Sequence, residues 1–169
     1  MVSTLKQYND LYKKAYEILG DLTPLESDCG KLCSAACCKG DENTGMRLFP
    51  HEESALKVIE CDGFRLSVCN GSCERDLRPL SCRIFPFFPV LHKNGRITAE
   101  IDARALRLCP IAENCDKVRF NKDFITAVRK VGRLLSQDPE CRKFIADTSA
   151  EINSYKKLLG FNKRYSKRR

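Results

Sequence analysis

Apolar residues recur at helical spacing between charged positions in the N-terminal stretch of the chain. The members of this stripe are Leu5, Tyr8, Leu11, Ala15 and Ile18. The three- and four-residue repeat predicts an amphipathic helix from about Leu5 to Leu19. Thr4 with Gln7 is a plausible capping box at its start, and Gly20 a plausible stop.

Two more helix starts are indicated before the middle of the chain. Thr23 with Pro24 and Glu26 has the residue types favoured at the cap, the first and the third position of a helix. A short helix is also expected after Pro50, in the segment HEESALKVIE.

The pattern then changes to that of β-strands. Residues 64–68 alternate as a short strand. Residues 89–92 and 96–101 flank Asn94-Gly95, the dipeptide favoured by a two-residue type I′ turn. The sequence therefore predicts a small antiparallel hairpin.

Two helices are predicted to close the chain. The apolar stripe of the first consists of Phe124, Val128, Val131 and Leu135. Asp138 and Pro139 start the second. Its apolar face consists of Cys141, Ile145, Ile152, Tyr155 and Leu159. This order of elements predicts an α+β fold, mainly helical, with a small antiparallel β-hairpin.

Length and composition indicate one globular domain. The chain has 169 residues, of which 43% are hydrophobic and 31% charged. No apolar run approaches the roughly 20 residues of a membrane span, and the N-terminus has no signal-peptide core. We expect a cytoplasmic protein without a membrane partner. We expect residues 1–160 to form a single domain, with a metal-binding core at 29–115 and a helical part at 117–160.

Charge is distributed unevenly along the chain. Residues 1–116 carry 15 Lys and Arg against 17 Asp and Glu, whereas residues 117–169 carry 15 against 5. The last segment, 161–169, is a basic tail. Such a tail adds affinity for any polyanion without reading its sequence, and the alternative is a solvated terminus.

Cysteine is the unusual residue, with 11 in the chain, ten of them between Cys29 and Cys115. Thiols stay reduced in the cytosol, so metal binding explains them better than a disulfide framework does.

The first cluster is the run CGKLCSAACC, from Cys29 through Cys33 to the vicinal Cys37 and Cys38. If it is helical, the first three sulfurs stay on one face, and if it is looped, they can wrap around one ion. Either geometry places three or four thiolates near a single centre. Four cysteines in ten residues make packing alone a poor explanation.

Three further segments contribute cysteines. These are Cys69 and Cys73 around an Asn-Gly turn, Cys82 after Arg-Pro-Leu-Ser, and Cys109 before Pro110. Such thiolate sets suit zinc or an iron–sulfur cluster and poorly suit Mg²⁺ or Ca²⁺. The three-residue gaps depart from the two-residue gaps of zinc knuckles.

These motifs resemble a known family. The runs CGKLCSAACC and CNGSCERDLRPLSCRIFPF and the following Leu-Cys-Pro are similar to the zinc- or iron-chelating cysteine-cluster family of YkgJ-like, CxxCxxCC proteins. The resemblance covers about half of the chain. It implies eight metal ligands, which by position are Cys29, Cys33, Cys37, Cys38, Cys69, Cys73, Cys82 and Cys109. The first gaps are one residue wider than in the family pattern, so the choice between Cys37 and Cys38 is open. One branch of the family is associated with lysine methylation of flagellin.

The other cysteines and the two histidines have simpler interpretations. Cys141 is expected in the core of the last helix, and Cys61 is expected not to be a ligand. Cys115 could complete a site, although the resemblance does not require it. His51 is expected in a helix first turn or exposed, and His92 at the surface.

Aromatic and basic residues surround Cys82. The segment Phe85–Phe88 is expected to shield a metal site rather than to stack on bases. Arg78 and Arg83 are expected to offset thiolate charge rather than to bind phosphate.

No nucleotide-binding, zinc-protease or hydrolase motif occurs in the chain. The sequence therefore favours a cytosolic metal-binding protein that holds zinc or an iron–sulfur cluster in a structural or redox role. Two alternatives stay open: a metal-cluster-dependent enzyme similar to a protein lysine methylase, and a zinc-dependent nucleic-acid-binding module.

Overall fold

A computed structural model of the chain describes residues 2–39, 44–69, 71 and 74–161. The elements follow in the order α1 (Val2–Leu19), α2 (Gly30–Cys33), η1 (Ala36–Cys38), β1 (Gly45–Arg47), β2 (Val58–Cys61), β3 (Phe64–Val68), η2 (Arg75–Leu77), α3 (Leu80–Ile84), β4 (Phe87–Leu91), β5 (Ile97–Ile101), η3 (Ala103–Arg107), α4 (Pro110–Glu113), α5 (Lys122–Leu135) and α6 (Pro139–Leu158), where η denotes a 3-10 helix. Helices combined with small antiparallel sheets confirm the predicted α+β class.

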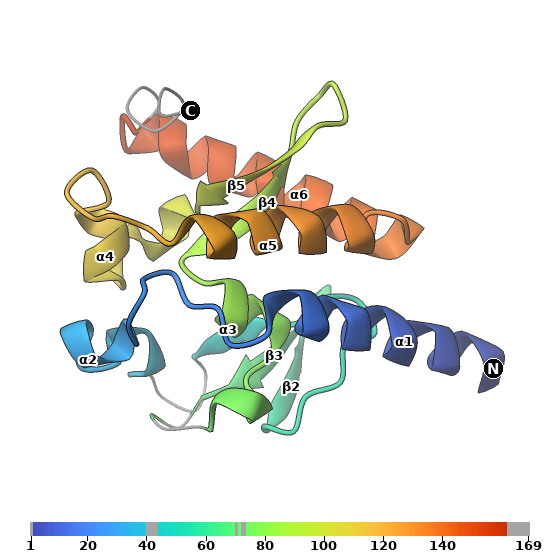
Figure 1. The fold of residues 1–169 in the computed structure, drawn as a ribbon. Coiled ribbons are helices and arrows are strands. Elements are labelled where there is room, and N and C mark those ends of the chain that lie inside the picture. Colours follow the sequence, from blue (N-terminus) through green and yellow to red (C-terminus); the bar gives the residue numbers. More distant parts are fainter. Residues whose placement is uncertain (1, 40–43, 70, 72–73, 162–169) are drawn as a thin grey trace.

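The C-terminal half is built around the predicted hairpin. β4 and β5 pair antiparallel, with Phe87 opposite Ile101. α5 packs against both strands and α6 against β4 (Figure 1). The predicted stripe of α5 is fully buried, as are Cys141, Ile145 and Ile152 of α6. The prediction was wrong for Tyr155 and Leu159, which are 43% and 46% exposed. The buried residue of this turn is instead Lys156, whose ammonium group pairs with Glu100 of β5.

The turn of this hairpin is one residue longer than predicted. The backbone N–H of Gly95 donates to the carbonyl of His92, and His92 N–H donates to Arg96. Gly95 has a φ of 78°, whereas Asn94 keeps a negative φ. The loop is therefore a type I turn followed by a left-handed glycine, which is the usual three-residue hairpin.

A three-stranded antiparallel sheet in the order β1-β3-β2 lies in the other half of the molecule. The strand predicted at 64–68 is its centre, with Met46 opposite Ser67 on one side and Glu60 opposite Arg65 on the other. β1 approaches so closely that a Cβ on Gly45 would lie 2.2 Å from the carbonyl oxygen of Ser67. α3 lies between this sheet and α5, beside α1 (Figure 1).

The helix predicted after Pro50 is absent, and a turn followed by β2 takes its place. Glu52 N–H donates to Phe49 O at 3.1 Å, and His51 has a φ of 59°. This is a type II turn with Pro50 at its second position. The helix is lost because the Glu52 side chain turns inward, where it accepts a hydrogen bond from Phe49 N–H.

The N-terminal helix is confirmed, with two changes at its ends. It begins at Val2, so Thr4 lies inside it rather than at its cap. It ends as predicted at Gly20, which has a φ of 47° and donates to Tyr16 O. The helix start predicted at Thr23 is wrong, because residues 24–27 form bends and the Thr23 hydroxyl donates to Leu25 O. Among the helices of the described residues, none has the length and apolar character needed to cross a membrane.

Candidate metal centre

The first cysteine cluster is a short helix that ends in a sharp reversal of the chain. Cys29 immediately precedes α2, and Cys33 is its last residue. Ser34 and Ala35 both have left-handed backbone, with φ of 50° and 52°, which costs a non-glycine residue about 1–2 kcal/mol. The chain returns as η1, whose last two residues are the vicinal cysteines. Backbone strain of this kind clusters at functional sites.

The turn after β3 lies against η1. Cys69 follows the last residue of β3, and its N–H donates to Thr44 O at 3.4 Å. A Cβ built on Gly71 would lie 3.9 Å from the carbonyl oxygen of Cys38. Two cysteine segments about thirty residues apart in the sequence are therefore neighbours. Cys73 lies outside the described residues.

Two further cysteines are positioned by helix starts. Cys82 is the third residue of α3, and its N–H donates to Pro79 O at 2.9 Å. Cys109 immediately precedes α4, where Pro110 occupies the first turn. Cys109 is only 6% exposed. Both side chains are thus carried on short, well-defined elements.

The thiols interact across these segments. The Cys37 thiol interacts electrostatically with those of Cys29, Cys33 and Cys109. Cys29 interacts with Cys33 and Cys109, and Cys109 interacts with Cys33. All six pairs among these four cysteines therefore interact electrostatically.

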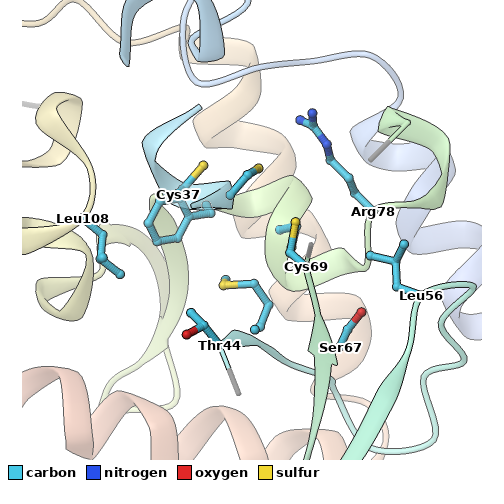
Figure 2. Close-up of a pocket in the computed structure, with 12 residues that line it drawn as sticks. Cys37, Thr44, Leu56, Ser67, Cys69, Arg78 and Leu108 are labelled. Carbon is cyan, nitrogen blue, oxygen red and sulfur yellow. The ribbon is translucent and has the colours of Figure 1, made fainter. Parts of the chain in front are cut away.

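The strongest thiol neighbours of Cys38 are Cys37 and Cys69. Together with Cys82, these three line one pocket (Figure 2). Leu108 and Cys37 lie on one side of the pocket, and Cys69 lies on the other. The remaining lining residues are Thr44, Gly45, Met46, Leu56, Ser67, Arg78 and Phe85. Four of the eight predicted ligands therefore line this pocket, and Cys29, Cys33 and Cys109 interact electrostatically with one of them, Cys37.

Burial makes these thiols weak acids in the metal-free protein. It raises the pKa of Cys29, Cys37 and Cys109. Burial and then the neighbouring Cys37 thiol raise the pKa of Cys38 to about 12. These groups are therefore protonated near neutral pH, and a metal that binds them has to displace protons.

The cysteines are gathered, but they do not converge on one point. In the part of the chain that the structure describes, no three His, Cys, Asp or Glu side chains are placed to hold one ion. The donor chemistry nevertheless fits a soft metal, because thiolates select zinc and iron–sulfur clusters.

The two arginines near Cys82 have different surroundings. Arg78 lines the pocket and lowers the thiol pKa of Cys29 and Cys38 against the raising effect of burial. That is the sign expected of a cation that offsets thiolate charge. Arg83 instead lies 4.8 Å from the ring centre of Tyr16 and pairs with Asp76 at 3.6 Å.

The aromatic segment beside Cys82 is mostly interior. Phe87 and Phe88 are 6% and 5% exposed, and only Phe85 lines the pocket. A base could not stack on the two buried rings without unfolding the hairpin. The arrangement is that of an apolar wall beside the thiols.

Cys61, Cys115 and Cys141, the three cysteines outside the predicted ligand set, do not line the pocket. Cys141 is fully buried, as predicted, with its sulfur 3.4 Å from the hydroxyl of Tyr12. Cys115 is 4% exposed in the hydrophobic core. Cys61 ends β2 opposite Phe64 and does not line the pocket.

Both histidines pair with carboxylates. His51 is exposed, as one of the two predicted alternatives had it, and lies in a turn rather than in a helix; it contacts Glu140 at 2.8 Å and stacks on Tyr8. His92 contacts Glu100 at 3.1 Å. Each of these contacts gives the imidazole a structural role on the surface of the fold.

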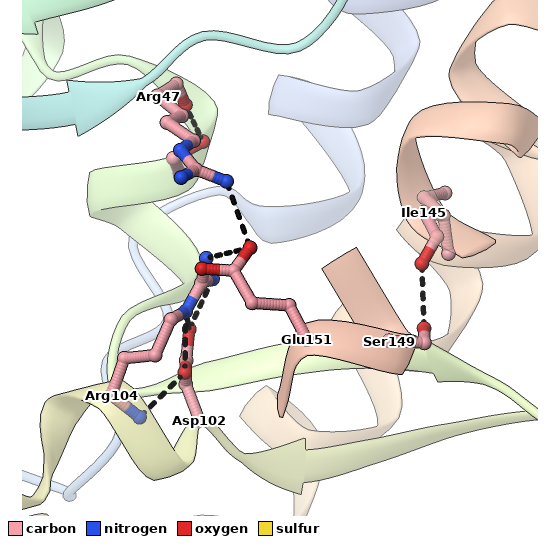
Figure 3. Close-up of polar contacts among 7 residues, drawn as sticks. Arg47, Asp102, Arg104, Ile145, Ser149 and Glu151 are labelled. Atoms are coloured by element: carbon pink, nitrogen blue, oxygen red, sulfur yellow. Dashed lines mark hydrogen bonds and ion pairs between the residues drawn. The ribbon is translucent and has the colours of Figure 1, made fainter. Parts of the chain in front are cut away.

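A charge network fastens the elements around the pocket (Figure 3). Glu151 of α6 pairs with Arg47 at 2.8 Å and with Arg104 at 3.2 Å. Arg104 also pairs with Asp102, which caps η3. Burial opposes the charge on Arg104, but the Asp102 hydrogen bonds prevail and raise its pKa. The network connects β1 and η3 to α6. β1 contributes residues to the pocket, and η3 precedes Cys109.

Sequence reasoning missed two groups of residues at this site. The pocket walls Met46, Leu56 and Leu108 carry no motif. Glu52 was interpreted as part of a helix first turn, yet it is fully buried and accepts a hydrogen bond from Leu80 N–H at the start of α3. The sequence alone gives no signal for this role, because it does not show that the Glu52 carboxylate is buried.

The chain was compared with models of protein families, with curated proteins and with solved structures. None of the three comparisons finds a match.

Proposed function

We propose that the protein binds a soft metal, as zinc or an iron–sulfur cluster, through clustered cysteine thiolates. The proposed ligands are Cys29, Cys33, Cys37, Cys38, Cys69, Cys73, Cys82 and Cys109. One observation carries the proposal: α2–η1, the end of β3, α3 and the start of α4 deliver thiols to one region of the fold. Cysteines that served only to pack the core would not be expected to cluster in one region.

Charge supports the same conclusion. Four thiolates on a zinc ion leave a net charge of about −2, which a nearby cation stabilises. Arg78 lowers the thiol pKa of both Cys29 and Cys38 and so favours their thiolate forms. The similarity of these motifs to the cysteine-cluster family points the same way.

The role we propose for the metal is structural or redox. The candidate ligands come from segments far apart in the sequence, so a bound metal would cross-link separate parts of the fold. Binding free energy at such a site adds directly to folding free energy. The pocket beside the thiols is the observation that favours the enzymatic alternative, because an enzyme needs room for a substrate.

Metal analysis of the anaerobically purified protein, with its visible spectrum, tests the proposal. Zinc in a colourless protein, or iron with a broad visible absorbance, would support it. Cys82→Ser should lose metal because a serine oxygen is a harder ligand than a thiolate. Cys141→Ala is the matched control, since that cysteine is buried beside Tyr12, and it should keep its metal. A wild-type protein without zinc or iron would contradict the proposal.

A further inference from the structure

Two adjacent cysteines line the pocket with their thiols in contact. Cys37 and Cys38 are the last two residues of η1, and both line the pocket (Figure 2). Their thiols are hydrogen-bonded to each other. Cys38 N–H donates to Ala35 O at 2.8 Å, so the backbone of the pair is held in a helical turn. The structure therefore presents two sulfur atoms side by side at a cavity.

This pair is reachable from solvent, and the surface beside it is apolar. Cys37 is exposed and Cys38 is half-buried. Leu108 lies on the same side of the pocket as Cys37 and is 53% exposed (Figure 2). The large apolar side chains that line the pocket are Met46, Leu56, Phe85 and Leu108. A ligand that bonds to both sulfurs can therefore enter from solvent and place its remaining substituent against apolar side chains.

The donors at this site suit a ligand that needs two bonds. In the part of the chain with described placement, no three His, Cys, Asp or Glu side chains are positioned to hold one ion. A tetrahedral zinc ion takes four ligands, whereas trivalent arsenic that already carries one carbon substituent takes two more. Soft sulfur donors select soft acceptors, and trivalent arsenic is one. Its carbon-bound substituent would then occupy the apolar pocket.

We propose that in the metal-free protein Cys37 and Cys38 form a binding site for a monosubstituted trivalent arsenical, R–As(OH)2, in which R is an aromatic or other apolar group. Two As–O bonds and two S–H bonds break, and two As–S bonds form. Each thiol proton leaves with an arsenic hydroxyl as water, so arsenic stays trivalent and nothing is oxidised or reduced. This site uses two of the proposed metal ligands, but it does not require that the protein binds zinc or iron.

Calorimetric titration of the reduced, metal-free full chain with phenylarsine oxide tests the pair. The buffer contains 2-mercaptoethanol, which competes for arsenic held by a single protein sulfur. Cys37→Ser and Cys38→Ser should each weaken the tightest site about a hundredfold or more, because the second sulfur no longer adds to binding. Cys69→Ser and Cys82→Ser, at the other two thiols of the pocket, are the matched controls and should keep the site. Circular dichroism checks that each chain is folded.

The substituent tests the apolar wall of the pocket. The wild type should prefer phenylarsine oxide to its methyl analogue. Leu108→Ser should reduce this preference about fivefold, because it removes part of the apolar surface that the ring would cover. Leu108 is suitable for this change because half of its side chain is exposed, so the fold should tolerate the substitution.

Several results would overturn the arsenical site. They are a wild type with no tight site, a tight site that Cys37→Ser keeps, an equal loss in all four serine variants, an unchanged preference in Leu108→Ser, and a metal-free chain that is unfolded. None of them bears on zinc or iron in the native protein. The absence of both metals there would reject the proposed metal-binding function and leave the arsenical site standing.

Discussion

The carboxylate of Glu52 accepts a hydrogen bond from the backbone N–H of Leu80 at 2.6 Å, across 28 residues of sequence. Leu80 is the first residue of α3, the helix that carries Cys82. The same carboxylate accepts from Tyr16 at 2.7 Å and from Phe49 N–H at 3.0 Å. One buried side chain therefore connects α1, the turn before β2 and the helix of a candidate ligand.

Replacing Glu52 should destabilise the fold strongly. Glu52→Ala leaves two backbone N–H groups and a tyrosine hydroxyl without an acceptor in the interior. Each buried unsatisfied group costs about 1–3 kcal/mol, so we expect a loss of about 3 kcal/mol or more in urea unfolding. Glu53→Gln, at the exposed neighbouring position, is the control and should change stability by less than about 0.5 kcal/mol. Equal effects of the two variants would contradict this role.

The pH dependence of stability should also reveal Glu52. Burial raises its pKa above the ordinary 4.5, despite hydrogen bonds from Leu80, Tyr16 and Phe49 that act in the opposite direction. The folded state therefore binds this proton more tightly than the unfolded chain does. Its stabilising contribution is complete below the ordinary glutamate pKa and is lost as pH rises through the raised pKa. Wild-type stability, measured relative to Glu52→Gln by urea unfolding, should fall over that range. A difference that is constant with pH, or that grows, would refute this.

Periodicity was enough to predict the elements that bury a continuous apolar face. The stripe of Phe124 and Val128 in α5 is an example. The alternation of residues 64–68 also predicted β3, although burial in this strand does not alternate. The segment after Pro50 shows the limit. Its acidic residues fit a helix first turn, but Glu52 gains more hydrogen bonds by turning into the core, and only the tertiary structure supplies those donors.

The candidate site, too, could be predicted from the sequence only in part. Spacing and residue type pointed to the cysteines, and a long-range arrangement brings Cys109 to the cluster formed by Cys29 and Cys33. Nothing local could have predicted the left-handed Ser34 and Ala35, since both residue types avoid that conformation.

Metal removal should weaken the fold. The candidate ligands join α2–η1, α3 and the start of α4, so binding free energy at the cysteines contributes to folding free energy. We expect a chelator under reducing conditions to lower the melting temperature followed by circular dichroism. Readdition of the metal found in the native protein should restore it. A demonstrably metal-free protein with an unchanged melting curve would show that the cysteines do not couple metal to folding.

Gly132 should not tolerate alanine, although alanine is normally the better residue inside a helix by about 1 kcal/mol. A Cβ at this position would lie 2.4 Å from Pro89 Cβ and 3.0 Å from Ile97 Cγ2. Gly132→Ala should therefore push α5 from the hairpin and cost about 1–3 kcal/mol in urea unfolding. Arg133→Ala, at the exposed next position, should have little effect. A Gly132→Ala variant as stable as the wild type would mean that the helix and hairpin do not approach this closely.

The basic tail should be separable from the fold, but only beyond Phe161. Gly160 has a φ of 64° and donates to Lys157 O, while Phe161 N–H donates to Lys156 O at 2.8 Å. These two bonds are the Schellman cap of α6, and the Phe161 side chain packs against the core. A chain that ends at Phe161 should keep its metal content and melting temperature, whereas one that ends at Gly160 should lose stability by about 1 kcal/mol.

Residues 162–169 contain five Lys and Arg and no acid, so ending the chain at Phe161 lowers the net charge from +8 to +3. Any nucleic-acid binding of the full chain should be salt-sensitive and should fall sharply in this variant, because it would depend on phosphate contacts. Fluorescence anisotropy with a labelled duplex at two salt concentrations measures both effects. Salt-resistant, sequence-selective binding that survives the truncation would contradict this prediction. It would favour a nucleic-acid-binding module in the folded part of the chain, where residues of the pocket such as Arg78 would have to supply the contacts.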